Sequence, residues 1–442
     1  MDTGEDLHSW ATDLFPIARS LTGNGVRQTL AYLQVLLPEL AIHEIPSGTQ
    51  VLDWTIPDEW NISSAFVADP DGNRIIDFAE NNLHVVGYST PIDEIMDLAE
   101  FDAHLHSLPD QREAIPYVTS YYSRNWGFCV TQEQREQLGE GPFHVKIDST
   151  LQPGSLTYAE VVIPGETADE VLLSTYMCHP SMANNELSGP VAAVALARWL
   201  KSLPRRKYTY RILFIPETIG SIAYIAGHLE HLKEHVRAGW VLTCMGDDRT
   251  YSYVPSRLGN TLSDKISRRV LQERGYDYKT YTFLDRGSDE RQWCAPGVDL
   301  PVASLMRSKY GEFPEYHTSL DDLAFVTPTG LEGGLDIMKD ALTLMEENSS
   351  WTVTTLGEPQ LGKRGLYPTI STKASTALVY DMMNVIAYCD GEHDVIDIAE
   401  ICGITTSEVR TIQRKLSDPG LLVENQNSPY RAADPQSEVP GR

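Results

Sequence analysis

Four segments of the chain each present a histidine or an acid, three of them just beyond an apolar run. These candidate ligands are His179, Glu217, Asp247 and His317. Imidazole nitrogens mixed with carboxylates are typical of a hydrolytic zinc centre that keeps one position open for water. Taken singly, Glu217 could cap the helix that follows it, and Asp247 could hold a turn. The coincidence of four such residues on separate elements favours a shared metal site.

A second group of charged residues lies in the segment 285–292, which shows no helical periodicity. We expect Arg286 or Arg291 to hold a substrate carboxylate or to stabilise an oxyanion, and Asp289 or Glu290 to receive a substrate amine. The structural alternative is a solvated turn.

Three further residues have both a functional and a structural interpretation. Arg257 could bind substrate or form an ion pair, and Tyr316, which precedes His317, could position a carbonyl or simply pack. Cys178 could act as a thiol nucleophile, but a small buried side chain at the end of a strand is the more ordinary interpretation.

The strands that precede these residues must position them. Apolar, β-branched runs predict strands at 159–164, 170–176, 210–216 and 240–244. Helical periodicity follows most of them, as at 190–203 and 222–237, and this alternation predicts an α/β fold with a mostly parallel sheet. Loops that follow the ends of parallel strands meet at one edge of a sheet, which is where we expect the four candidate ligands to converge.

Other regions have different patterns. Residues 7–40 predict helices, and residues 51–157 predict a small β-rich unit that is inserted before the sheet. After a linker near 356–368, three helical runs and a short apolar segment have the proportions of a winged helix over 365–430. Residues 372–442 hold 11 acidic against 6 basic side chains, which argues against DNA binding. The polar tail, residues 431–442, is expected to be disordered.

The composition narrows the class of protein. The 442 residues include 62 Asp and Glu against 35 Lys and Arg, giving a formal charge of −27. Such acidity disfavours nucleic-acid and anionic-membrane partners, and no long apolar run predicts a membrane span. Six widely spaced cysteines suit reduced thiols. We therefore expect a cytoplasmic protein.

Several segments together resemble a known family. They are Leu14-Phe-Pro-Ile-Ala-Arg-Ser-Leu-Thr-Gly, Cys178-His-Pro-Ser-Met-Ala-Asn-Asn-Glu-Leu-Ser-Gly, Phe214-Ile-Pro-Glu-Thr-Ile-Gly-Ser, Gly246-Asp-Asp-Arg, Leu284-Asp-Arg-Gly-Ser-Asp-Glu-Arg-Gln and Tyr310-Gly-Glu-Phe-Pro-Glu-Tyr-His-Thr-Ser-Leu-Asp-Asp. The chain is similar to aminopeptidase-like proteins with an inserted protease-associated-like domain and a C-terminal winged helix, a branch of the co-catalytic zinc aminopeptidases. The resemblance implies a catalytic domain over 1–50 and 158–355, with the insertion over 51–157.

The resemblance also implies zinc ligands at His179, Glu217, Asp247 and His317, with a metal-bridging aspartate at position 185. Here that position is Asn185, and a neutral amide offsets the repulsion between two zinc ions poorly. Glu186 could substitute for it. We therefore expect one zinc ion, held by Glu217, His317 and either Asn185 or Glu186, with two ions as the alternative.

A second departure concerns the general base. The family commonly has two successive glutamates, of which the first is the base, whereas here Pro216 precedes Glu217. Either Glu217 is the base, or the base is another carboxylate, for which Asp289, Glu290 and Glu315 are the candidates.

These observations predict a zinc-dependent hydrolase of an amide or peptide bond, of the aminopeptidase or small-conjugate amidase type. Its expected partner is a small peptide or aminoacyl conjugate, and a homo-oligomer is possible on this sequence. Two alternatives stay open: a scaffold protein that has lost its metal, and a metal-dependent acyl transfer or cyclisation within a biosynthetic pathway.

Overall fold

The computed structural model describes residues 2–366 and 373–425 of the chain. They form two compact units: residues up to 264 together with 276–339, and residues 265–275 together with the chain from 340 onward. The tail predicted to be disordered, 431–442, lies outside the described residues. So do positions 367–372 and 426–430 of the predicted winged helix.

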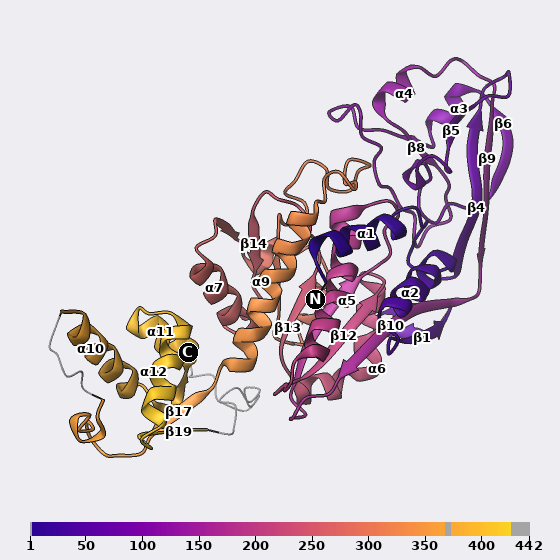
Figure 1. Cartoon of the computed structure of the whole chain (residues 1–442). Helices are drawn as coiled ribbons and strands as arrows, with labels where there is room; N and C mark the ends of the chain where they lie inside the picture. The colour runs from indigo at the N-terminus through magenta and orange to yellow at the C-terminus, as the bar shows by residue number, and fades with distance from the viewer. Residues whose placement is uncertain (1, 367–372, 426–442) are drawn as a thin grey trace, which may run out of the picture. The chain divides into compact units, whose positions relative to one another are not determined.

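An eight-stranded sheet forms the centre of the first unit (Figure 1). Its spatial order is β1 (Ala41–Pro46), β10 (Ser155–Ile163), β12 (Thr209–Ile215), β11 (Glu170–Tyr176), β13 (Val236–Leu242), β16 (Val302–Met306), β14 (Tyr251–Val254) and β15 (Tyr278–Thr280). The four strands from β12 to β16 are parallel to one another, and β10 and β14 run antiparallel to their inner neighbours. The predicted α/β class with a mostly parallel sheet is therefore confirmed.

Helices cover both faces of this sheet. They are α1 (Gly4–Leu14), α2 (Asn24–Leu36), α5 (Ser188–Ser202), α6 (Ile219–His235), α8 (Glu290–Trp293), and parts of α7 (Leu262–Arg274) and α9 (Pro328–Glu347). Successive side chains of a strand point to opposite faces. Leu172 of β11 packs with Tyr224 of α6 and Trp293 of α8, whereas Thr175 faces Gly189 at the start of α5. Helices α5 and α6 therefore lie on opposite faces.

A second, antiparallel sheet lies within the segment predicted to be a β-rich insertion. Its order is β5 (Arg74–Asp77), β4 (Glu59–Ala68), β9 (Phe143–Gln152) and β6 (Ile92–Met96), and Figure 1 shows β4 and β9 as long neighbouring strands. It has its own core, which includes Val67, Phe101 and Val145. The segment also contains the pairs β2 (Gln50–Val51) with β3 (Trp54–Thr55) and β7 (Leu105–His106) with β8 (Phe128–Cys129), and the short helices α3 (Leu98–Asp102) and α4 (Gln132–Glu136). The boundaries 51–157 stay a prediction.

The second unit contains the winged helix. Its sheet has the order β18 (Asp390–Asp394), β17 (Ser350–Val353) and β19 (Leu422–Glu424), and its helices are α10 (Lys373–Ala387), α11 (Val395–Cys402) and α12 (Thr406–Ser417). Because β17 is the central strand of this sheet, the sheet begins before residue 365, where the sequence pattern placed the start of the winged helix.

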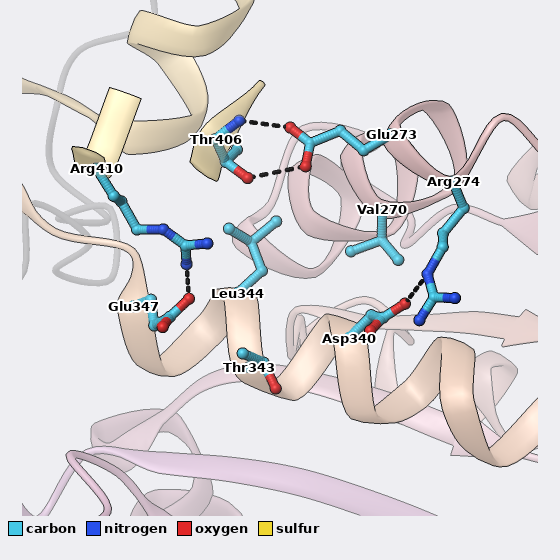
Figure 2. Close-up of a pocket in the computed structure, with 9 residues that line it drawn as sticks. All are labelled: Val270, Glu273, Arg274, Asp340, Thr343, Leu344, Glu347, Thr406 and Arg410. Atoms are coloured by element: carbon cyan, nitrogen blue, oxygen red, sulfur yellow. Dashed lines mark hydrogen bonds and ion pairs between the residues drawn. The ribbon is translucent and has the colours of Figure 1, made fainter. Parts of the chain in front are cut away.

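The first turn of α12 is held by α7 within the second unit (Figure 2). The backbone N–H and hydroxyl of Thr406 donate to the two carboxylate oxygens of Glu273, at 2.6 and 2.9 Å. A cavity of about 260 Å³ adjoins this contact, and its charged side chains pair with one another: Arg274 with Asp340, and Arg410 with Glu347.

Candidate active site

The ends of β11 and β12 and the loop after β16 enclose a cavity of about 400 Å³ in the first unit. Its lining residues are Leu21, Trp54, Tyr117, Thr119, Tyr121, Tyr122, Cys178, His179, Glu217, Thr218, Ile219 and His317. The structure thus brings together three of the four candidate ligands, His179, Glu217 and His317, from three separate elements, as expected for loops at the ends of parallel strands.

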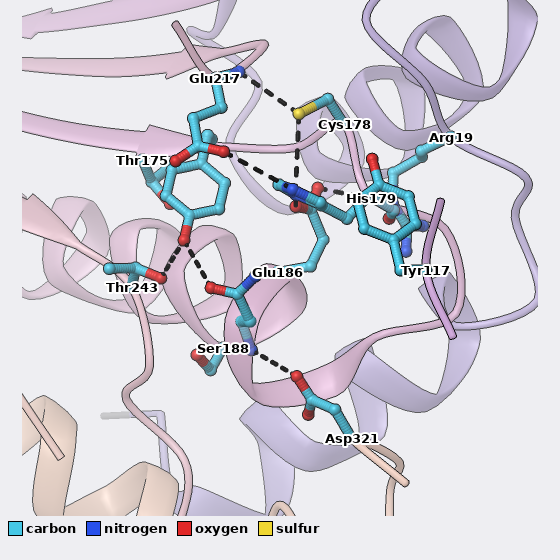
Figure 3. Close-up of polar contacts among 12 residues, drawn as sticks. Arg19, Tyr117, Thr175, Cys178, His179, Glu186, Ser188, Glu217, Thr243 and Asp321 are labelled. Carbon is cyan, nitrogen blue, oxygen red and sulfur yellow. Dashed lines mark hydrogen bonds and ion pairs between the residues drawn. The ribbon is translucent and has the colours of Figure 1, made fainter. Parts of the chain in front are cut away.

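His179 lies between two carboxylates (Figure 3). Its Nδ1 lies 2.7 Å from Oε2 of Glu186, and its Nε2 lies 3.5 Å from Oε2 of Glu217. When Nδ1 of His179 carries the proton and donates a hydrogen bond to Glu186, the lone pair of the imidazole is on Nε2, which faces the cavity. Glu186 is therefore placed to orient His179 from behind.

A buried arginine, to which the sequence analysis gave no role, completes this contact. Nε of Arg19 lies 3.7 Å from Oε1 of Glu186 and donates to the carbonyl oxygen of His179 at 3.1 Å, and both charged side chains are fully buried. Burial raises the pKa of Glu186, and the guanidinium opposes this shift. The sequence signal was a single charge in the mostly apolar stretch 16–21.

Glu186 comes from a short π-helix, Ala183–Leu187, that leads directly into α5. The carboxylate of Asp321 fixes the start of this turn, because it accepts from the backbone N–H groups of Asn184 (2.6 Å) and Asn185 (2.9 Å). Single-turn π-helices are frequent at functional sites, since the extra residue redirects a side chain. Here the buried side chain that this turn presents to His179 is Glu186.

His317 closes the other side of the cavity. Its ring stacks on Tyr316 with centroids 3.9 Å apart, and it lies 5.4 Å from the ring of His179. Burial lowers the pKa of both histidines to about 3, so both imidazoles are neutral at physiological pH. Nε2 of His317 is buried and has no hydrogen-bond partner among the described residues. An orphaned buried nitrogen of this kind is expected where a cation binds.

The loops of the site hold unusual backbone conformations. Ser181, Thr218 and His317 are not glycines, yet their φ angles are 45°, 65° and 57°. Each such residue costs on the order of 1–3 kcal/mol and persists only where the surroundings enforce it, most often at functional sites. Thr218 is enforced by Asp289, which accepts from its backbone N–H at 2.7 Å.

The structure does not bring Asp247 to the two imidazoles. Its carboxylate is fully buried and accepts from the N–H and hydroxyl of Ser308, the N–H of Arg249 and the side-chain amide of Asn184. Four donors saturate both oxygens, so the group is held as part of a structural network. Asn184, which the sequence analysis missed, and not Asn185, is the amide beside this acid.

Asn185 faces a different set of partners. Its side-chain oxygen accepts from the hydroxyl of Tyr176 at 2.9 Å, and this hydroxyl also lies 2.6 Å from Oγ1 of Thr243. The remaining candidate from this turn, Glu186, contacts Nδ1 of His179 and not the cavity. Neither residue lines the cavity that holds Glu217 and His317.

The charged loop 285–292 lies behind the cavity. Oδ1 of Asp289 accepts from Thr218 and Ser221, and its buried Oδ2 has no partner among residues 2–366 and 373–425. Burial raises the pKa of Asp289 to about 7. Arg291 donates to Oγ1 of Thr218 at 2.9 Å. Glu290 accepts hydrogen bonds from the N–H groups of residues 287 and 288 and from the hydroxyl of Tyr310. Its carboxylate therefore stabilises the conformation of its own loop.

Two other candidates are engaged away from the cavity. Arg286 is exposed, donates to the carbonyl of Phe283 and stacks on its ring. Arg257 donates to the carbonyl of Cys294 and pairs with Asp299. These contacts are those of the structural alternatives considered from the sequence.

Glu315, a candidate base, forms a two-point ion pair with Arg249 at 2.7 and 2.8 Å. Tyr316 contributes a ring face to His317 and is not among the lining residues.

One alternative metal site is geometrically compact but chemically unsuited. Donor atoms of Cys178, His179 and Glu186 all lie within 4.8 Å of one another. However, burial raises the pKa of the Cys178 thiol well above its usual range, and the Arg19 guanidinium already faces Glu186. The same burial argues against a reactive thiolate at Cys178. Nε2 of His179, Nε2 of His317 and the carboxylate of Glu217 instead face one cavity and are of the two-histidine, one-glutamate type known from catalytic zinc sites. In the described part of the chain their donor atoms do not all lie within 4.8 Å of one another, so a bound ion would need these side chains to move closer.

None of the helices in the described part of the chain is both long and apolar enough to cross a lipid bilayer.

Comparisons with known proteins agree with this architecture. Residues 8–348 match the family described as "Domain of unknown function (DUF4910)", and residues 349–424 match a winged helix-turn-helix family. A protein from Clostridium acetobutylicum, named "Putative polysaccharide biosynthesis protein with aminopeptidase-like domain", is 43% identical over 411 residues, which cover 92% of this chain and 94% of that protein.

Solved structures extend the comparison. A crystal structure of a "putative peptidase" from Clostridium acetobutylicum is similar over 96% of both chains, with a TM-score of 0.89 and 41% identity. A zinc aminopeptidase from Bacillus subtilis is similar over 78% of this chain and 95% of its own, with a TM-score of 0.57 and 12% identity, which shows a shared fold alone. The predicted aminopeptidase-like fold with a C-terminal winged helix is confirmed.

Proposed function

Because the chain belongs to the DUF4910 family and has an aminopeptidase-like fold with a terminal winged helix, we propose that it is a metal-dependent hydrolase. Its reaction would be cleavage of an amide or peptide bond, of the aminopeptidase or small-conjugate amidase type. The observation that carries this proposal is the convergence of His179, Glu217 and His317 on an open cavity, with the buried Nε2 of His317 lacking a partner.

The donor set suits one divalent cation, for which zinc is the candidate. His179, His317 and Glu217 would hold it, and Glu186 would fix the ring of His179 from behind. A bound zinc ion supplies Lewis acidity toward an amide carbonyl and makes a neighbouring water more acidic. The saturated hydrogen bonding of Asp247 favours one ion over two, because it leaves no free carboxylate beside Asn184 for a second one.

Glu217 is the candidate for proton transfer in the alternative arrangement, in which it is the base and not a ligand of the ion. It is the one carboxylate among the described residues that lines the cavity. Burial, reinforced by the charge of Asp289, raises the pKa of Glu217 well above its usual range, so this carboxyl holds a proton more readily than an exposed glutamate does. Asp289 supports this role by fixing the strained Thr218 that follows Glu217.

The test combines metal analysis with turnover. Protein freed of metal by a chelator and reloaded with zinc should bind about one ion and release amino acids from a panel of aminoacyl amides. His317→Ala should lose zinc and activity, whereas His393→Ala, a surface histidine paired with Asp390, should retain both. Glu217→Gln should lose turnover; retained zinc would assign Glu217 as base, and lost zinc would assign it as ligand.

A metal-free scaffold is the second candidate, and it has its own supporting observation. The side-chain amide of Asn184 donates a hydrogen bond to Asp247. This carboxylate, which could otherwise bind a metal, is therefore occupied by a protein group. A zinc content below one ion per chain that His317→Ala does not change would favour the scaffold.

If turnover is found, incorporation of solvent oxygen into the product distinguishes hydrolysis from acyl transfer.

A further inference from the structure

Four aromatic side chains from the inserted segment form one wall of the candidate active-site cavity: Trp54, Tyr117, Tyr121 and Tyr122. On the premise that this cavity is the active site proposed above, we propose that this aromatic wall is the subsite for the acyl side chain of the substrate. The group that it selects is bulky and apolar, preferably aromatic, and carries no carboxylate or phosphate.

The wall is tied directly to the candidate metal ligands. The ring of Tyr117 lies 5.1 Å from that of His179 and 5.1 Å from that of His317, and the backbone N–H of Tyr117 donates to the carbonyl of His317 at 2.9 Å. Ile115 and Ser319 exchange two more hydrogen bonds, of 3.0 and 2.9 Å. A substrate group against this wall is therefore held next to the reacting centre.

The outer part of the wall is exposed to solvent. Trp54 is 39% exposed and Tyr122 is 56% exposed, and their rings meet edge to face with centroids 5.7 Å apart. Trp54 belongs to the tight β2–β3 hairpin, whose turn residue Leu52 has a φ of 52°. Exposed aromatic faces beside a cavity gain free energy when an apolar ligand covers them, because aromatic rings bring large apolar areas and favour stacked or edge contacts.

The charges of the cavity exclude an anionic group at this wall. Within the described chain, no lysine or arginine lines the cavity, and Glu217 is its one carboxylate. The nearby Arg291 is engaged with Oγ1 of Thr218. A carboxylate or phosphate against the aromatic wall would be desolvated with no lysine or arginine beside it, which is costly, whereas an ammonium group would be attracted by the aromatic faces.

The polar capacity of the wall is too small for a sugar ring. The hydroxyls of Tyr117 and Tyr121 lie 2.5 Å apart and bond to each other, so the pair has only one hydroxyl hydrogen left to donate. Beyond these two hydroxyls, the polar groups of the wall itself are the indole N–H of Trp54 and the hydroxyl of Tyr122. A polyhydroxylated ligand would leave several of its own groups unsatisfied there.

Calorimetric titration of the full chain with amino alcohols tests the subsite independently of turnover, because amino alcohols contain no amide bond. L-Phenylalaninol should bind more tightly than L-alaninol and than the aspartate-derived amino alcohol. Trp54→Ala and Tyr122→Leu should each weaken L-phenylalaninol binding by about 10-fold, while leaving L-alaninol binding and the melting temperature near wild type. Tyr380→Ala, which removes a 66% exposed tyrosine from α10, is the matched control and should change nothing.

The outcomes separate this subsite from the proposed reaction. Trp54-dependent binding of L-phenylalaninol without hydrolysis of any amide would support the subsite and count against the reaction. Hydrolysis with no preference for L-phenylalaninol over L-alaninol would overturn the subsite and leave the reaction standing. Trp54-dependent binding of N-acetylglucosamine in place of L-phenylalaninol would also overturn the apolar class.

Discussion

The proposed metal site depends on two imidazoles that burial keeps neutral. His179 and His317 come from loops 138 positions apart in the chain, and their rings lie 5.4 Å from each other. Neutral imidazole is the form that can bind a cation. The two rings differ in their contacts: His179 has a carboxylate at Nδ1, whereas His317 has a stacked tyrosine and an Nε2 with no hydrogen-bond partner in the described part of the chain.

Replacement of the supporting carboxylate should weaken the metal site without removing a ligand. Glu186→Gln keeps the shape of the side chain but offers His179 a weaker acceptor and leaves Arg19 without its anion. We expect zinc affinity to fall by about 10-fold or more, measured by competition with a chromophoric chelator. Glu166→Gln, which alters an exposed pair with Arg205, is the matched control. Equal affinities of the two variants would show that Glu186 does not support the metal site.

A buried histidine that does not line the cavity should make stability depend on pH. His84 is 3% exposed, its Nδ1 donates to the carbonyl of Cys129 at 2.8 Å, and burial lowers its pKa below 6.5. The unfolded chain takes up a proton as pH falls through about 6.5, whereas the folded protein does not, so the contribution is present above this pH and is lost below it.

His84→Asn retains a donor for Cys129 but cannot be protonated. The free energy of unfolding should therefore fall less between pH 7 and pH 5 in the variant, by up to about 2 kcal/mol. Urea unfolding at both pH values measures this difference. An identical decrease in both proteins would mean that His84 binds its proton equally well when folded.

At the scale of elements, the packing of α5 against the sheet fixes the loop that carries the site. The π-turn with Glu186 runs directly into α5, and the first turn of this helix lies close to β11 and β13. A Cβ atom at Gly189 would lie 2.2 Å from the carbonyl oxygen of Leu242 and 2.4 Å from Oγ1 of Thr175. No residue larger than glycine fits at this distance.

Two glycine substitutions should therefore have opposite effects. Gly189→Ala should lower the free energy of unfolding by about 2–3 kcal/mol, because the helix must move away from the sheet. Gly227→Ala, at an exposed position of α6 with nothing within 4 Å, should raise it by up to about 1 kcal/mol through helix propensity. Denaturant unfolding of both variants checks the pair; a stable Gly189→Ala protein would show that the approach of α5 to the sheet can relax.

Most elements were within reach of sequence reasoning, because their periodicity records which face is buried. The apolar run over 170–176 predicts β11 with its observed bounds, and the helical opening predicts α1 and α2. The winged helix was placed from its helices, but its central strand β17 was missed. This strand is only four residues long and lies before the linker that served as the boundary.

At the scale of the whole molecule, the inserted segment helps to build the site. Residues of the insertion, including Val51, Trp60 and Tyr88, share one core with Cys178 and with Ile219 of α6. This shared core explains why aromatic side chains from residues 54 and 117–122 reach the cavity. It also explains why the insertion and the central sheet belong to one compact unit, while the winged helix belongs to the other.

The sequence by itself determined the α/β class, the winged helix and the candidate ligands at the strand ends, because local periodicity and residue type report burial and donor chemistry directly. Only the tertiary structure decided that Asp247 is saturated by Ser308 and Asn184, that Glu186 lies behind His179, and that Arg19 faces Glu186. These contacts join side chains that are far apart in the sequence. No local pattern in a single sequence predicts which distant side chains will be in contact.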